Sequence, residues 1–128
     1  MSKVQIIITQ DPTGQELVAF ASQTAERLVK DGLTRSQIRN IFTEVRKVEA
    51  LWETDPQGAL RRLVMLKPKL DYQAARQRHV QGLKNVLTEA IDYVAQGKDP
   101  KEQTDRFQRF VDLFEAILAY HRAKGGRN

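Results

Sequence analysis

LTRSQIRNIFTEVRKVEALW, residues 33–52, decides the fold, because it contains the start signal and the apolar stripe of one amphipathic helix. Thr34 with Gln37 forms a capping box, and Leu33 with Ile38 occupies the two positions of a hydrophobic staple. Apolar side chains then recur at steps of three and four residues, at Ile38, Ile41, Phe42, Val45, Val48 and Trp52. Such a stripe needs a neighbouring element to cover it. The stretch therefore predicts a helix that packs inside a helical protein.

Proline and glycine mark the boundaries of the other helices. An acidic N-cap precedes a proline at the first helical position, where its missing N–H costs nothing, in Asp11-Pro12, Asp55-Pro56 and Asp99-Pro100. We therefore predict helices at about 13–30, 56–66 and 100–122, with Gly32 ending the first in a left-handed cap. The last has the widest apolar face, which indicates a central helix or one that also meets a partner.

Residues 67–95 carry two apolar stripes that one straight helix cannot bury against one neighbour. Leu66, Leu70 and Ala74 set the first stripe. The second is rotated by more than a quarter turn and comprises Val80, Leu83, Val86, Leu87, Ala90, Ile91 and Val94. We favour a break near Arg78 to Gly82, and the alternative is a continuous helix that packs on two different surfaces.

The N-terminal residues Val4, Ile6, Ile7 and Ile8 are predicted to be extended, either as a tail or as a strand added to something else. The length of 128 residues fits one domain that buries roughly two thirds of the surface that the unfolded chain would expose. The predicted fold class is all-α: a compact bundle of about five helices over residues 13–124, preceded by an N-terminal tail over residues 1–12.

The net charge of the chain is concentrated in one third of it. Residues 33–78 contain ten Lys or Arg and five Asp or Glu, and this excess equals the overall charge of +5. Cations gathered in this way are typical of a surface that meets an anionic partner.

The chain has no cysteine, no apolar run long enough to span a bilayer and no signal peptide. We expect a cytoplasmic protein that does not contact the membrane.

Catalytic groups do not converge in this sequence. The two histidines, His79 and His121, have no other ligand at metal-binding spacing, and none of the three serines sits in a nucleophile elbow. His121 is better explained as an imidazole packed at a helix C-terminus. No glycine-rich phosphate loop is present. We therefore expect no enzymatic activity, no metal site and no cofactor.

Two cationic faces stand out on the predicted helices. Arg35, Arg39 and Arg46 project within about 40° of one another at about 100° per residue, which matches a phosphate backbone. Lys69, Tyr72 and Arg76 share a face after Pro68, and an aromatic ring between two cations can stack on a base.

The alternative for the first face is a solvated surface, with Arg46 paired to Glu49. The alternative to base stacking by Tyr72 is that its ring packs at the edge of the core. Lys67, Arg78, Arg61 and Arg62 add positive charge nearby.

Three motifs in order resemble a known family. They are LTRSQIR with EVRK (residues 33–39 and 44–47), LKPKLDYQAAR (residues 66–76) and residues 110–122, which end in EAILAYHR. Together they resemble the small subunit of the type III-A CRISPR-Cas effector, the Csm complex. The resemblance covers residues 33–122, and residues 1–32 and 77–82 receive no role from it.

The resemblance implies a non-catalytic helical subunit, present in several copies that stack into an inner filament, with a possible homodimer when free. Its partners would be crRNA, target RNA and the other Csm subunits, which carry the nuclease and cyclic oligoadenylate activities. By position in the motifs and in the basic faces, the candidate RNA-binding residues are Arg35, Arg39, Arg46, Lys47, Lys67, Lys69, Tyr72 and Arg76. Arg78 joins these candidates because it adds positive charge beside the second face.

Two other functions remain open at this point. Leu28, Gly32 and Ile38 fall at the helix-turn-helix positions of a double-stranded DNA-binding protein, although Leu28 is bulky where alanine is favoured. That function leaves Lys67, Lys69 and Arg76 without a task. The third possibility is a helical scaffold whose basic face meets an acidic protein.

Overall fold

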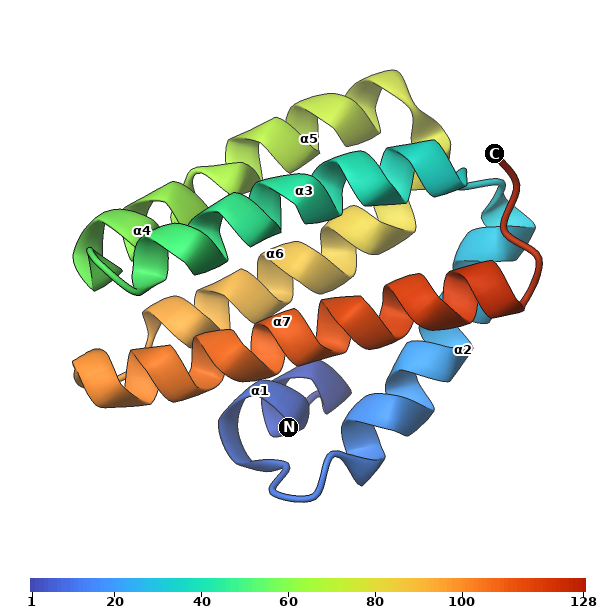
Figure 1. The fold of residues 1–128 in the computed structure, drawn as a ribbon. Coiled ribbons are helices and arrows are strands. Elements are labelled where there is room, and N and C mark those ends of the chain that lie inside the picture. The colour runs from blue at the N-terminus through green and yellow to red at the C-terminus, as the bar shows by residue number, and fades with distance from the viewer.

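The computed structural model describes residues 1–128 as seven α-helices and one short 3-10 turn, with no strand (Figure 1). In chain order these are α1 (Lys3–Gln10), α2 (Gln15–Asp31), α3 (Arg35–Trp52), α4 (Pro56–Val64), α5 (Leu66–Arg76), η1 (Arg78–Val80), α6 (Gln81–Ala95) and α7 (Pro100–Ala123). The all-α prediction is confirmed. The number of helices exceeds the expected five or so mainly because α1 was not predicted.

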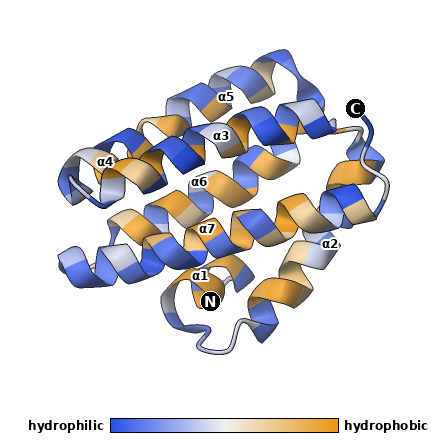
Figure 2. Cartoon of the chain, viewed as in Figure 1, coloured by the Kyte–Doolittle hydropathy of each residue, from blue (hydrophilic) through white to orange (hydrophobic).

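α7 is the longest helix and packs against α1, α2, α3 and α6. This position explains the wide apolar face predicted from the sequence, because α7 meets neighbours on several sides. Phe107 stacks on Trp52 of α3, and Phe114 meets Phe42 of α3 edge to face. In Figure 2 hydrophilic residues cover much of the visible surface of α3 and α5, whereas α1 and α6 show more hydrophobic residues.

The helix starts follow the capping signals in three of four cases. The Thr34 hydroxyl accepts from the Gln37 amide at 3.1 Å, and the Gln37 side chain accepts from the Thr34 amide at 2.9 Å. Asp55 and Asp99 also accept from backbone amides as N-caps, each with its proline in the first turn. Gly32 ends α2 with φ +90°, as predicted for a left-handed cap.

The fourth start, at Asp11-Pro12, was placed too early. α2 begins at Gln15, after Gly14 with φ +79°, because residues 11–14 form the reversal that follows α1. The Asp11 carboxylate still serves α2, since it accepts from the Leu17 amide at 3.0 Å.

The prediction of an extended N-terminal segment is wrong, because residues 3–10 form α1. The Ser2 hydroxyl caps this helix by accepting from the Gln5 amide at 3.1 Å. Val4, Ile7 and Ile8 share one face and are buried in the same core as α6 and α7. A helix of eight residues is marginal alone. Burial against α6, α7 and α2 therefore overrides the local preference of this β-branched segment.

The predicted break within residues 67–95 is confirmed. α5 ends at Arg76, Gln77 is extended with φ −135° and ψ 102°, and α6 begins at Gln81 after η1. The break allows both stripes to be buried, Leu70 and Ala74 from α5 and the second stripe from α6. α4 and α5 are separated only by Met65, which itself has helical dihedral angles.

Candidate nucleic-acid interface

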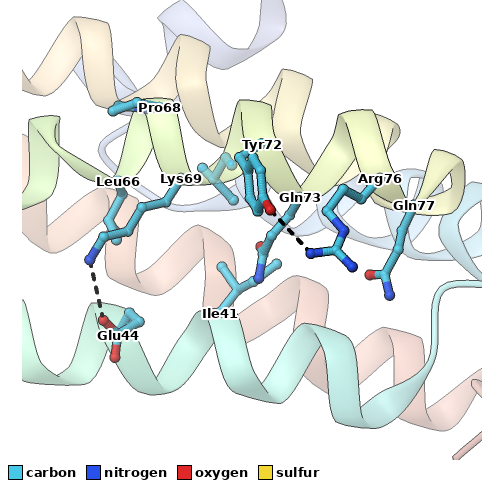
Figure 3. A pocket seen from close by; sticks show the side chains of 10 residues that line it. Ile41, Glu44, Leu66, Pro68, Lys69, Tyr72, Gln73, Arg76 and Gln77 are labelled. Atoms are coloured by element: carbon cyan, nitrogen blue, oxygen red, sulfur yellow. Dashed lines mark hydrogen bonds and ion pairs between the residues drawn. The ribbon is translucent and has the colours of Figure 1, made fainter.

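A groove of about 700 Å³ runs between α3 and α5 (Figure 3). It arises because α5 buries Leu66, Leu70 and Ala74 by packing on α6 and α4, which leaves another of its faces beside α3. The lining residues are Ile41 and Glu44 from α3, and Leu66, Pro68, Lys69, Leu70, Tyr72, Gln73, Arg76 and Gln77 from α5 and its C-cap.

Tyr72 and Arg76 form a pair on the exposed wall of this groove. Tyr72 is 63% exposed, so it is a surface side chain rather than the edge of the core. The Arg76 guanidinium carbon lies 5.6 Å from the centre of the Tyr72 ring, and Arg76 Nη1 donates to Tyr72 Oη at 3.1 Å. The predicted face of Lys69, Tyr72 and Arg76 therefore lines one groove.

Glu44 places a carboxylate inside the same groove. The Lys47 ammonium lies 2.9 Å from Glu44 Oε2, and Lys69 Nζ lies 4.0 Å from Glu44 Oε1. The hydrogen bond from Lys47 lowers the pKa of Glu44 below its ordinary value, and the charges of Lys47, Lys69 and Arg62 act in the same direction. Glu44 is thus ionised at neutral pH and neutralises part of the charge of two predicted RNA contacts.

The arginines of the first predicted face lie on the opposite flank of α3, against α7. Arg35 and Arg39 line a small depression of about 50 Å³ together with Arg122. Neither arginine has an acidic partner within 4.0 Å. Arg39 is exposed, whereas Arg35 is half-buried and its backbone amide donates to the carbonyl of Arg127 near the C-terminus. The two cationic faces are therefore separated by the outer surface of α3.

Arg46 is engaged within the protein, as the alternative of a pair with Glu49 predicted. Its guanidinium lies 2.7 Å from Glu49 and 3.5 Å from Glu115 of α7, and it stacks 4.7 Å from the Phe42 ring centre. The hydrogen bond that Arg46 donates to the Glu49 carboxylate raises the pKa of Arg46, so the guanidinium stays charged. Arg46 connects α3 to α7 and is a weak candidate for RNA contact.

The last two predicted contacts differ from each other. Lys67 forms an ion pair with Asp92 of α6, whereas Arg78 in η1 is exposed and has no acidic partner within 4.0 Å.

Sequence reasoning missed Glu44, Gln73 and Gln77 as groove residues because nothing in the sequence pairs α3 with α5. It could have found Arg122, which ends the third quoted motif.

No group of three or more His, Cys, Asp or Glu side chains is arranged to hold a metal ion. His121 is 1% exposed, and its Nε2 lies 2.7 Å from the Leu33 carbonyl oxygen, which fits a packed imidazole near the end of α7. No helix combines the length and the hydropathy needed to cross a bilayer.

The helix-turn-helix alternative depends on α2 and α3. Gly32 does form the left-handed turn between them, but α2 packs along α7 and has little contact with α3. Lys69, Tyr72 and Arg76 gather at a groove that such a DNA-binding unit would not use.

A comparison with protein families relates most of the chain to one of them. The model of the family described as Csm2 Type III-A matches residues 11–127, which covers α2 to α7 and leaves α1 outside. No curated protein and no solved structure matched the chain. The match contains all three motifs noted in the sequence and extends beyond them at both ends. The chain therefore belongs to the Csm2 family, the small subunit of the type III-A Csm complex.

Proposed function

We propose that this small subunit binds the backbone of single-stranded RNA through the groove between α3 and α5 and across the outer surface of α3 to Arg39. The observation that supports the proposal best is the exposed Tyr72–Arg76 pair, with Lys69 one turn away on the same groove. Proteins that bind single-stranded nucleic acid combine cations along the backbone with aromatic rings on which bases stack. The small subunit would hold target RNA and crRNA in this way, without cutting them.

The free cations limit the strength of this binding. Arg76, Arg39 and Arg78 have no acidic partner, whereas Arg46, Lys47 and Lys67 are paired with carboxylates. About three phosphate contacts to single-stranded RNA give a slope near −2 for log K against log salt. One copy would then lose roughly twentyfold in affinity between about 50 and about 200 mM salt.

Useful affinity would come from several copies stacked along one strand. Linked contacts add their effects through a high local concentration, so each copy need bind only weakly. In this arrangement the subunits stack into a filament and contact the other Csm subunits, and guide pairing selects the target. Catalysis belongs to other subunits, and we expect the pure small subunit to show no nuclease activity with divalent metal.

A charge reversal tests the proposal. In a reconstituted Csm complex, the double variant Arg39→Glu with Arg76→Glu places acids at two free cations on either flank of α3. The matched control is Arg27→Glu with Lys30→Glu, which makes the same charge change on exposed positions of α2. Arg46 is unsuitable because a glutamate there would add a third carboxylate beside Glu49 and Glu115.

We expect the double variant to assemble normally and to lose at least about tenfold in affinity for target RNA, since two backbone contacts become repulsive. The α2 control should retain its affinity. Unchanged RNA affinity combined with failed assembly would instead favour the protein scaffold. Tight binding of the isolated subunit to one duplex DNA sequence, with no preference for single-stranded RNA, would favour the helix-turn-helix function.

A further inference from the structure

The groove between α3 and α5 contains a carboxylate that a phosphate track would avoid. Glu44 is ionised, and its side chain is 31% exposed. Its Oε2 lies 2.9 Å from the Lys47 ammonium, whereas Oε1 accepts no hydrogen bond within the protein and has Lys69 Nζ at 4.0 Å. A carboxylate repels phosphate oxygens and accepts readily from N–H groups. The part of the groove around Glu44 therefore favours an N–H donor over the phosphates of the RNA backbone.

The groove also offers an unused amide and an apolar wall. Gln73 projects from α5 toward Ile41 of α3, and the side chain makes no hydrogen bond within the protein (Figure 3). Leu66 and Pro68 add apolar surface along α5. A flat apolar ring with a polar edge fits both the amide and the apolar wall, whereas a charged group or a fully apolar group fits only one of them.

We infer that the groove takes one nucleobase of the bound RNA and prefers a base with an exocyclic amino group, so that cytosine binds better than uracil. This inference rests on the proposed RNA binding at Lys69, Tyr72 and Arg76. The cytosine amino group donates to the Glu44 carboxylate, a pairing that proteins use to recognise cytosine. Uracil presents a carbonyl oxygen at that position, which the carboxylate repels.

Gln73 can complete the contact because an amide both donates and accepts. The stacked base and the base in the groove need not be the same one, since Tyr72 lies on the exposed wall. The consequence is a mild sequence preference at one nucleotide for each subunit, in addition to the selection made by the guide.

Fluorescence anisotropy of the full-length protein with labelled oligocytidylate and oligouridylate of equal length tests this inference. Both are pyrimidine strands with the same backbone, so their ratio of affinities reports on the base, and the Glu44→Gln variant separates the base edge from stacking. At low salt and neutral pH we expect about fivefold tighter binding of oligocytidylate, the lower end for one base contact. Glu44→Gln should bring the ratio close to one, because the new amide can donate to the uracil carbonyl.

The matched control is Glu49→Gln, which removes an acid from the opposite flank of α3 beside Arg46. Both variants should bind RNA somewhat more tightly, since each loses a negative charge, but the control should keep the wild-type ratio. Equal affinity of the wild type for the two strands, or an unchanged ratio in Glu44→Gln, would overturn the inference and leave the proposed function in place. No binding of either strand at low salt would overturn both.

Discussion

Arg76 and Tyr72 form one unit on the surface of α5: the guanidinium lies 5.6 Å from the ring centre and donates to the hydroxyl at 3.1 Å. The two residues are one helical turn apart, so their contact is set by the helix itself. The ring is 63% exposed and contributes little to the core. Both side chains can therefore be changed to test binding with little effect on folding.

The first prediction concerns the ring. Tyr72→Ala should weaken single-stranded RNA binding by about 1 kcal/mol or more, about fivefold, because a stacking platform for one base is lost. Tyr72→Phe keeps the ring and should retain most of the affinity. Anisotropy titrations of both variants provide the measurement. If alanine binds as well as tyrosine, no base stacks at this position.

The second prediction separates the free arginine from the paired one. Arg39→Ala should reduce the slope of log K against log salt by about 0.7, the contribution of one phosphate contact to a single strand. Arg46→Ala should leave the slope unchanged, because Arg46 is paired with Glu49 and Glu115. Equal losses of slope in the two variants would show that Arg46 leaves its ion pairs to meet RNA.

Local sequence signals were sufficient for most of the fold. The capping box at Thr34, two of the Asp-Pro starts and the change of apolar phase near Gln77 each depend on neighbours within a few residues, so the chain itself displays them. α1 could not be predicted in this way. Val4, Ile7 and Ile8 become helical because α6 and α7 bury them, and the sequence does not display that tertiary contact.

In the candidate site, too, local spacing was predictable from the sequence and contacts between helices were not. Helical spacing predicted that Lys69, Tyr72 and Arg76 share a face, and they do line one groove. Spacing could not show that Glu115 of α7 pairs with Arg46, or that Asp92 of α6 pairs with Lys67. Those partners come from other helices, so the spacing along one helix does not reveal them.

The third prediction tests the role of α1 in the core. Ile7→Ala should lower the free energy of unfolding by about 2–5 kcal/mol, because Ile7 is fully buried and its truncation leaves a cavity. Val18→Ala on α2 is the control, since Val18 is 47% exposed and its truncation should cost about 0.5 kcal/mol or less. Urea unfolding measures both. A similar small effect in the two variants would mean that α1 is not part of the stable core in solution.

The fourth prediction concerns pH. The pKa of Glu44 is lowered from 4.5 in the folded protein, so the ionised form stabilises the fold above that value. This stabilisation is lost as the pH falls through the folded pKa, when the carboxylate that faces Lys47 becomes neutral. Glu44→Gln should therefore be less stable than the wild type at about pH 7 and should approach it at about pH 3. Urea unfolding at the two pH values checks the sign, and a constant difference between the proteins would contradict it.

The central claim is that RNA binds along the groove between α3 and α5. Titration of the ¹⁵N-labelled full-length protein with a short single-stranded RNA, followed by amide chemical shifts, tests this most directly. We predict that the largest shifts fall on residues 69–77 and 41–44, with a second set around Arg39, while α1 and α2 remain unchanged. Shifts centred on α1 and α2, or no shifts at saturating RNA and low salt, would contradict it.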